Sequence, residues 1–298
     1  MRQRFGSTDA ILLLTVVIWS LNVTVTKYIL EHGFQPLAFT TIRYGLAAAI
    51  FIVMTLFLER TLRIRGRAER IRVGVGAIAL TLNQLCFVYA LTLTTATTVA
   101  LLLGTLPVFS ALFSTATGLE TPSGRFWLAA GVSFAGVAVL AGGSGGDLGG
   151  ELGGVLAGLG MAATWSVYSV AVAPLMGTYS PFRVSAIVMT LTWAMVALAA
   201  TPQLSDQDWD LGGLVWIGLA YAIAGPLVLT TVLWFIAIHR VGPSHAALFA
   251  NLQPFLGAMF AVVLLSEPLT ALEVAGGTLI AAGILLAGRP APVAAPSE

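Results

Sequence analysis

Long apolar stretches alternate with short polar or glycine-rich turns along the whole chain. A stretch of about 20 apolar residues is what a helix needs to cross a hydrocarbon core of about 30 Å. Ten stretches fit that length, at residues 9–30, 36–58, 72–91, 97–117, 124–141, 151–174, 181–200, 211–237, 244–265 and 270–288. This pattern predicts an all-α polytopic membrane protein with ten transmembrane helices.

The composition supports the same class. Of the 298 residues, 58% are hydrophobic and only 9% are charged, whereas a soluble domain carries about a quarter charged residues. The single cysteine, Cys86, lies inside an apolar stretch and excludes intramolecular disulfides and thiolate metal clusters. We therefore expect no metal and no cofactor. The arginine-rich segment 60–72 is explained by membrane topology, so no nucleic-acid partner is expected.

Basic and acidic residues fall in different sets of loops. Twelve of the fourteen basic residues lie in the N-terminus, the alternate loops and the C-terminal tail: Arg2, Arg4, Arg60, Arg63, Arg65, Arg67, Arg70, Arg72, Arg125, Arg183, Arg240 and Arg289. The other loops hold no basic residue but contain Glu31, Asp147, Glu151, Asp206, Asp208, Asp210 and Glu267. By the positive-inside rule, this distribution predicts that both termini are cytoplasmic.

One sequence pattern occurs twice. "GTLPVFSALFSTATGLETPS" begins at Gly104 and "NLQPFLGAMFAVVLLSEPLT" begins at Asn251, so that Pro107 recurs as Pro254 and Glu120 as Glu267, each after 147 positions. The same shift places Trp19-Ser20 nearly on Trp165-Ser166. We therefore expect two five-helix repeats, residues 1–145 and 146–290, followed by a short tail at 291–298. Because five is odd, the second repeat must have inverted topology around a central cavity, as in many secondary transporters.

These paired segments carry a resemblance to a known family. "ALTLTTATTVALLLGTLPVFSALFSTATGLE" and "AIHRVGPSHAALFANLQPFLGAMFAVVLLSEPL" resemble the two repeats of EamA-type carriers of the drug/metabolite transporter superfamily, over essentially the whole chain. The resemblance implies a ten-helix basket whose cavity is lined mainly by helices 1, 3, 4, 6, 8 and 9. Among bacterial members, the chain looks most like exporters of amino acids, notably aromatic ones, in the inner (plasma) membrane.

Polar and aromatic side chains inside the apolar stretches are candidates for the cavity lining, since they are costly in lipid. Thr15, Trp19, Asn22 and Thr26 share one helix face. Amides and rings suit a zwitterionic or amphipathic solute. The alternatives are bonds between helices for the polar groups and interfacial anchoring for tryptophan. The candidates are Trp19, Asn22, Asn83, Gln84, Phe87, Trp165, Tyr168, Thr231, Trp234, Asn251 and Gln253.

Two prolines and two basic residues complete the candidate set. Pro107 and Pro254 interrupt their apolar stretches and are expected to act as hinges or, alternatively, as fixed kinks. Lys27 and Arg43 are the two basic residues outside the cytoplasmic set. For Arg43 we favour pairing with Glu31 or snorkelling to the interface, with attraction of a substrate carboxylate as the alternative. Glu120 and Glu267 are expected to cap or pair at helix ends, and His245 to take an interfacial or capping role.

The leading hypothesis is export of small metabolites, namely amino acids including aromatic ones, by alternating access. Acidic residues lie at or near the ends of the apolar stretches, which argues against a carboxylate deep in the membrane for proton coupling. The alternatives are exchange of phosphorylated metabolites or nucleotide sugars, multidrug efflux, and a channel. An intramembrane enzyme is disfavoured, because no HExxH motif or paired aspartates occur within a stretch. The partners expected are a small-molecule substrate and the lipid bilayer, for a monomer or a homodimer.

Overall fold

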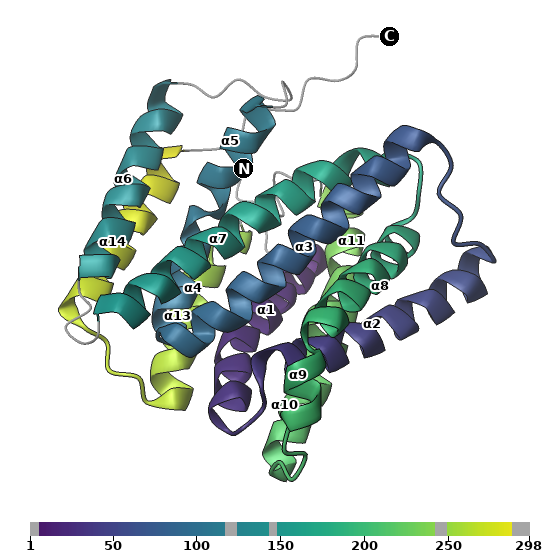
Figure 1. The fold of residues 1–298 in the computed structure, drawn as a ribbon. Coiled ribbons are helices and arrows are strands. Elements are labelled where there is room, and N and C mark those ends of the chain that lie inside the picture. Colours follow the sequence, from purple (N-terminus) through teal and green to yellow (C-terminus); the bar gives the residue numbers. More distant parts are fainter. Residues whose placement is uncertain (1–5, 117–123, 143–147, 242–248, 288–298) are drawn as a thin grey trace.

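The computed structural model describes residues 6–116, 124–142, 148–241 and 249–287, and within these ranges all regular structure is helical (Figure 1). Seven helical segments are long and apolar enough to cross a membrane, and three shorter apolar helices accompany them. The predicted polytopic all-α class is confirmed. The helices are α1 (Ser7–Glu31), α2 (Pro36–Glu59), α3 (Arg67–Leu93), α4 (Ala96–Leu102), α5 (Leu106–Ala116), α6 (Gly124–Gly142), α7 (Leu148–Val172), α8 (Pro181–Ala199), α9 (Thr201–Asp206), α10 (Gly213–Ile223), α11 (Thr230–Val241), α13 (Gln253–Leu265) and α14 (Ala271–Ala287).

Three of the predicted spans are broken by a change of helix type or a turn. A 3₁₀ turn, Leu103–Thr105, separates α4 from α5, and Pro107 lies in the first turn of α5. Pro254 lies in the first turn of α13, after a turn at residues 251–252. The structure therefore places a turn directly before Pro254, where the sequence predicts a hinge or a fixed kink. The first turn accepts proline because its N–H groups have no intrahelical partner. The third break is a π-helical segment, Ala224–Leu229, between α10 and α11.

Helices α2 and α8 form an antiparallel pair that is joined at both ends. At one end Arg183 of α8 forms an ion pair with Glu59 of α2. At the other end the Gln203 side chain accepts a hydrogen bond of 2.7 Å from the backbone N–H of Leu37. The end of α2 thus contacts the start of α8, and the start of α2 contacts α9, which directly follows α8, so α2 and α8 run in opposite directions.

Helices α6 and α14 pack antiparallel through glycines (Figure 1). A Cβ atom on Gly136 would lie 2.6 Å from the carbonyl oxygen of Gly276, and one on Gly283 would lie 2.8 Å from that of Ala129. Small residues allow helix backbones to approach this closely. The sequence motifs "GVSFAG" and "GGTLIAAG", which indicate close packing, therefore meet each other within one chain.

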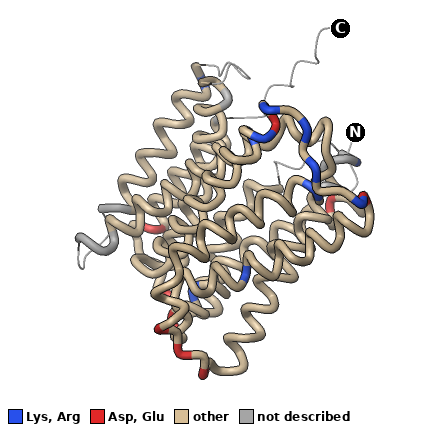
Figure 2. Tube along the Cα trace, turned by 45° about the vertical axis from the view of Figure 1, so that its right-hand side comes forward, with Lys and Arg blue, Asp and Glu red and all other residues tan. Residues whose placement is uncertain are grey.

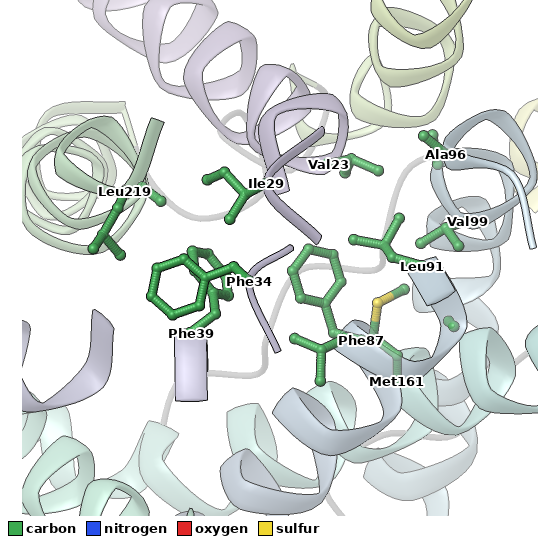
Figure 3. Packing of buried hydrophobic residues seen from close by; sticks show 14 of the residues in the cluster. Val23, Ile29, Phe34, Phe39, Phe87, Leu91, Ala96, Val99, Met161 and Leu219 are labelled. Atoms are coloured by element: carbon green, nitrogen blue, oxygen red, sulfur yellow. The ribbon is translucent and has the colours of Figure 1, made fainter. Parts of the chain in front are cut away.

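Helices α3 and α7 lie side by side across the middle of the molecule (Figure 1). The largest hydrophobic cluster of the described residues draws on helices of both halves and on the turn between α1 and α2, and it includes Val23, Phe34, Phe87, Met161 and Leu219 (Figure 3). Figure 3 shows the Phe39 and Phe87 rings pointing toward the same interior region. This cluster contains residues from both halves of the chain, so the two halves pack against each other in the core.

Charged residues gather at the two ends of the helices (Figure 2). We call the end that carries Arg60–Arg70 the basic end, and the end that carries Glu31 and Asp206–Asp210 the acidic end. At the acidic end Gln207 receives a 2.7 Å hydrogen bond from the Gln35 N–H, so its two loops are in contact. Glu120, His245 and the tail 291–298 lie outside the described residues.

Candidate functional site

A chain of buried polar side chains joins α2, α3 and α7. The guanidinium of Arg43 donates from Nη2 to Oε1 of Gln84. Gln84 in turn donates from Nε2 to Oδ1 of Asn83, at 2.7 Å. Asn83 donates from Nδ2 to the backbone carbonyl of Met161, at 2.8 Å. Three of the predicted site residues, counting Arg43, therefore form one connected network that ends on a helix of the other half.

Arg43 is enclosed by aromatic rings. The guanidinium carbon lies 5.0 Å from the centre of the Phe39 ring, 5.4 Å from that of Tyr44 and 5.8 Å from that of Phe87. These are cation–π distances. Arg43 is 2% exposed, so the expected snorkelling to the interface was wrong.

The expected ion pair between Arg43 and Glu31 was also wrong. Glu31 pairs instead with Lys27, which stands one helical turn before it on α1, with 3.3 Å between Nζ and Oε1. A spacing of four residues on one helix brings opposite charges together locally. In the part of the chain that the structure describes, Arg43 has no acidic partner, and its buried Nε has no hydrogen-bond acceptor.

Lys27 has a different environment. Its Nζ donates to the backbone carbonyls of Leu91, at 2.7 Å, and Thr94, at 3.0 Å, where α3 ends. The last carbonyls of a helix lack intrahelical donors and carry partial negative charge. Together with Glu31 they saturate the ammonium group. Lys27 thus holds α1 against the end of α3. Of the two basic candidates, Lys27 and Arg43, it is Arg43 that keeps a buried N–H donor without an acceptor within the described part of the chain.

A second group of candidates joins α1 and α11. The Trp19 and Trp234 rings lie 5.1 Å apart between centroids. The Trp19 Nε1 also donates, at 3.3 Å, to the carbonyl of Pro226 in the π-helical segment. One turn farther along α1, Oδ1 of Asn22 is buried and has no partner among the described residues. Thr231 bonds to the carbonyl of Leu227 in the preceding turn, at 2.6 Å.

The remaining candidates are placed on α7 and next to α13. Trp165 and Tyr168 contact each other on α7, with centroids 5.4 Å apart. Trp165 is 38% exposed and Leu156 is 60% exposed. The two residues lie on opposite sides of α7, because nine residues make about two and a half helical turns. Asn251 and Gln253 are half-buried at the start of α13. The structure therefore gathers the candidates into separate groups, of which Arg43–Gln84–Asn83 is the most enclosed.

Sequence reasoning did not identify the role of Pro226. The sequence feature that could have indicated a break in this helix is the proline inside the apolar segment "AGPLVL". The π-helical geometry here places the Pro226 carbonyl within reach of both Trp19 and Thr230. π-helical segments are frequent at functional sites.

Two glutamates at the acidic end of the helices serve as caps. Glu267 accepts from the backbone N–H groups of Ala96 and Thr97, both at 2.8 Å, at the start of α4. A carboxylate here offsets the positive end of the helix dipole, and the expected capping role of Glu267 is confirmed. Glu273 is 7% exposed and accepts hydrogen bonds from Thr98 of α4, from Thr95, which caps that helix, and from Thr270.

The chain is similar to transporters over almost its full length. Two curated proteins of Archaeoglobus fulgidus, each called an uncharacterized transporter, are 24% and 23% identical to it; each alignment covers 94% of this chain and at least 97% of the relative. The uncharacterized transporter YyaM of Bacillus subtilis is 24% identical over 88% of this chain and 87% of its own length. A protein of known crystal structure, 22% identical, superimposes with a TM-score of 0.66 over 95% of this chain and 97% of that one. The profile of the EamA-like transporter family matches residues 6–142 and again residues 152–289, so the chain belongs to the EamA-like transporter family.

Proposed function

We propose that this protein exports small metabolites across the inner membrane of a bacterium by alternating access, and that its substrates are amino acids, including aromatic ones. The observation that carries the proposal is where the two halves touch. Trp19 contacts Trp234, and Asn83 bonds to the Met161 carbonyl. Both contacts place predicted site residues between helices of the first and second half, the region where secondary transporters bind substrate.

The chemistry of these contacts favours an amphipathic solute. Carboxamide groups of Asn83 and Gln84 and the indole of Trp19 offer hydrogen bonds, and the neighbouring rings offer apolar area. A solute with one polar end and one apolar side chain satisfies both kinds of surface. Aromatic and aliphatic amino acids have this form.

Alternating access is further supported by signs of inverted repeats. Helices α2 and α8 occupy the same place in the two halves, and they run antiparallel. The contact of Gly136 with Gly276 becomes that of Gly283 with Ala129 when every residue is shifted by 147 positions and the halves are exchanged. Such an exchange of contacts is what a two-fold relation between repeats 1–145 and 146–290 produces. With the basic end on the cytoplasmic side, both termini are cytoplasmic.

Coupling through a proton-carrying carboxylate receives no support from the described acids near the helices. Glu267 and Glu273 lie at helix ends, where they accept hydrogen bonds from backbone N–H and threonine groups. We therefore propose a facilitative exporter or exchanger.

The test is counterflow of labelled amino acids into liposomes that contain the purified protein, with and without a pH gradient. We expect saturable exchange of phenylalanine and leucine that does not depend on the gradient. Exchange should fall at least several-fold in Asn83→Ala and in Trp165→Ala. Exchange of sugar phosphates or cationic drugs in place of amino acids would overturn the substrate assignment, and flux without saturation or counterflow would indicate a channel.

A further inference from the structure

We infer that the guanidinium of Arg43 is the receptor for the carboxylate of the transported molecule. This inference rests on the proposed function and narrows it: the substrate must carry a carboxylate. The observation behind the inference is the state of Arg43: its side chain is 2% exposed, and its Nε has no acceptor among the described residues.

The unsatisfied Nε donor of Arg43 is the first line of support. An arginine side chain has five N–H donors in a planar fork. The hydrogen bond found for this fork runs from Nη2 to Gln84. A buried donor without an acceptor destabilises the protein, and more so when the group is charged. A carboxylate supplies two oxygens in the geometry of the fork and would satisfy Nε together with a terminal nitrogen.

The charge balance around Arg43 is the second line of support. A buried charge is ordinarily paired with an opposite charge, but here the hydrogen-bonding partner is the neutral amide of Gln84 and the remaining neighbours are rings. The net positive charge of the site is therefore one unit. One carboxylate neutralises it, whereas a phosphate dianion leaves an excess negative charge. Lys27 cannot supply a second charge, because its ammonium is already saturated by two carbonyls and Glu31.

The hydrogen bonds from Arg43 through Gln84 and Asn83 connect substrate binding to the contact between α3 and α7. Gln84 joins Arg43 to Asn83, and Asn83 holds the Met161 carbonyl on α7, a helix of the second half. A substrate carboxylate that takes the place of the Gln84 oxygen releases Gln84 from the guanidinium. The substrate therefore weakens the polar link between α3 and α7 as it binds, which connects carboxylate binding to separation of the two halves.

The experiment compares phenylalanine with phenylalaninamide, which has the same ring and ammonium group but no carboxylate. Both are tested as competitors of labelled leucine exchange in liposomes. For the wild-type protein we expect phenylalanine to compete at least about 10-fold more strongly than the amide, the effect of one charge-assisted bond. In Arg43→Gln this preference should disappear.

A second variant guards against loss of fold in Arg43→Gln. Gln84→Glu has nearly the same shape and places a carboxylate directly on the guanidinium. It loses the hydrogen bond to Asn83 but gains a charge pair with Arg43, so the protein should remain folded while the receptor is occupied from within. Its preference for phenylalanine over the amide should also disappear. Lys27→Gln is the matched control: it removes the other cation outside the basic end and should keep the wild-type preference at a lower melting temperature.

The outcomes separate the inference from the function on which it rests. If wild-type protein exchanges leucine and both Arg43→Gln and Gln84→Glu keep the preference for phenylalanine, Arg43 is a structural cation and the inference is wrong. If wild-type protein prefers the amide or ignores the difference, the carboxylate requirement is wrong while amino-acid exchange stands. If wild-type protein exchanges no amino acid at all, the proposed function itself fails.

Discussion

The hydroxyl of Ser20 lies 3.3 Å from the backbone carbonyl of Gln253, the residue that precedes Pro254. The other half repeats this relationship: the hydroxyl of Ser166 lies 3.5 Å from the carbonyl of Leu106, which precedes Pro107. Each proline-containing helix is thus contacted, at the same point, by a serine from the opposite half. This equivalence explains why Trp-Ser recurs along the sequence near the same 147-residue shift as the prolines.

Removal of either serine hydroxyl should weaken these contacts without disturbing the packing. Both serines are fully buried, and each also bonds to a carbonyl in its own helix. We expect Ser20→Ala and Ser166→Ala each to lower the free energy of unfolding by about 0.5–1.5 kcal/mol. The losses should add in the double variant, since the two contacts share no residue. Thermal unfolding in detergent measures this, and a neutral double variant would contradict it.

Exchange rates of variants at Pro107 and Pro254 can distinguish moving hinges from fixed kinks. Both lie in first turns that follow a break in the α-helix, and Pro107 borders a small apolar recess that it shares with Val108, Ala130 and Gly283. If the breaks move during transport, Pro107→Ala and Pro254→Ala should lower the maximal exchange rate several-fold at an unchanged KM. Wild-type rates in both variants, with raised melting temperatures, would favour fixed kinks.

The close approach of α6 and α14 predicts a sharp contrast between two glycines of the same helix. A Cβ on Gly136 would meet a backbone carbonyl and the Ile280 backbone, whereas one on Gly131 would meet nothing within 4 Å. We expect Gly136→Ala to cost about 1–3 kcal/mol of stability, as overpacking does. Gly131→Ala should leave stability unchanged or slightly raised, because alanine has the higher helix propensity. Melting temperatures in detergent provide the comparison, and equal effects at both positions would mean that the helices do not pack this way.

Much of the fold follows from local sequence, and much of the site does not. The predicted apolar stretches overlap helices that the structure describes, and seven helical segments are long and apolar enough to span a membrane, because hydrophobic length is a local property. The Lys27–Glu31 pair was also within reach, since its four-residue spacing is local. The partner of Arg43, by contrast, is Gln84 on another helix, 41 positions away. Which face of α2 meets which face of α3 depends on packing that no single stretch encodes, so the site could be anticipated residue by residue but not as a network.

Glu267 offers a test of capping against proton coupling. Its two oxygens accept from the Ala96 and Thr97 N–H groups and from the Thr97 hydroxyl. In Glu267→Gln one oxygen becomes a donor that faces an N–H group, so we expect a loss of about 1–2 kcal/mol of stability. Asp210→Asn, an exposed acid at the same end, should be neutral. Because the carboxylate acts as a cap, the insensitivity of exchange to a pH gradient should persist in Glu267→Gln. If wild-type exchange instead follows the gradient and this variant abolishes the dependence, Glu267 carries a proton and the facilitative mechanism is wrong.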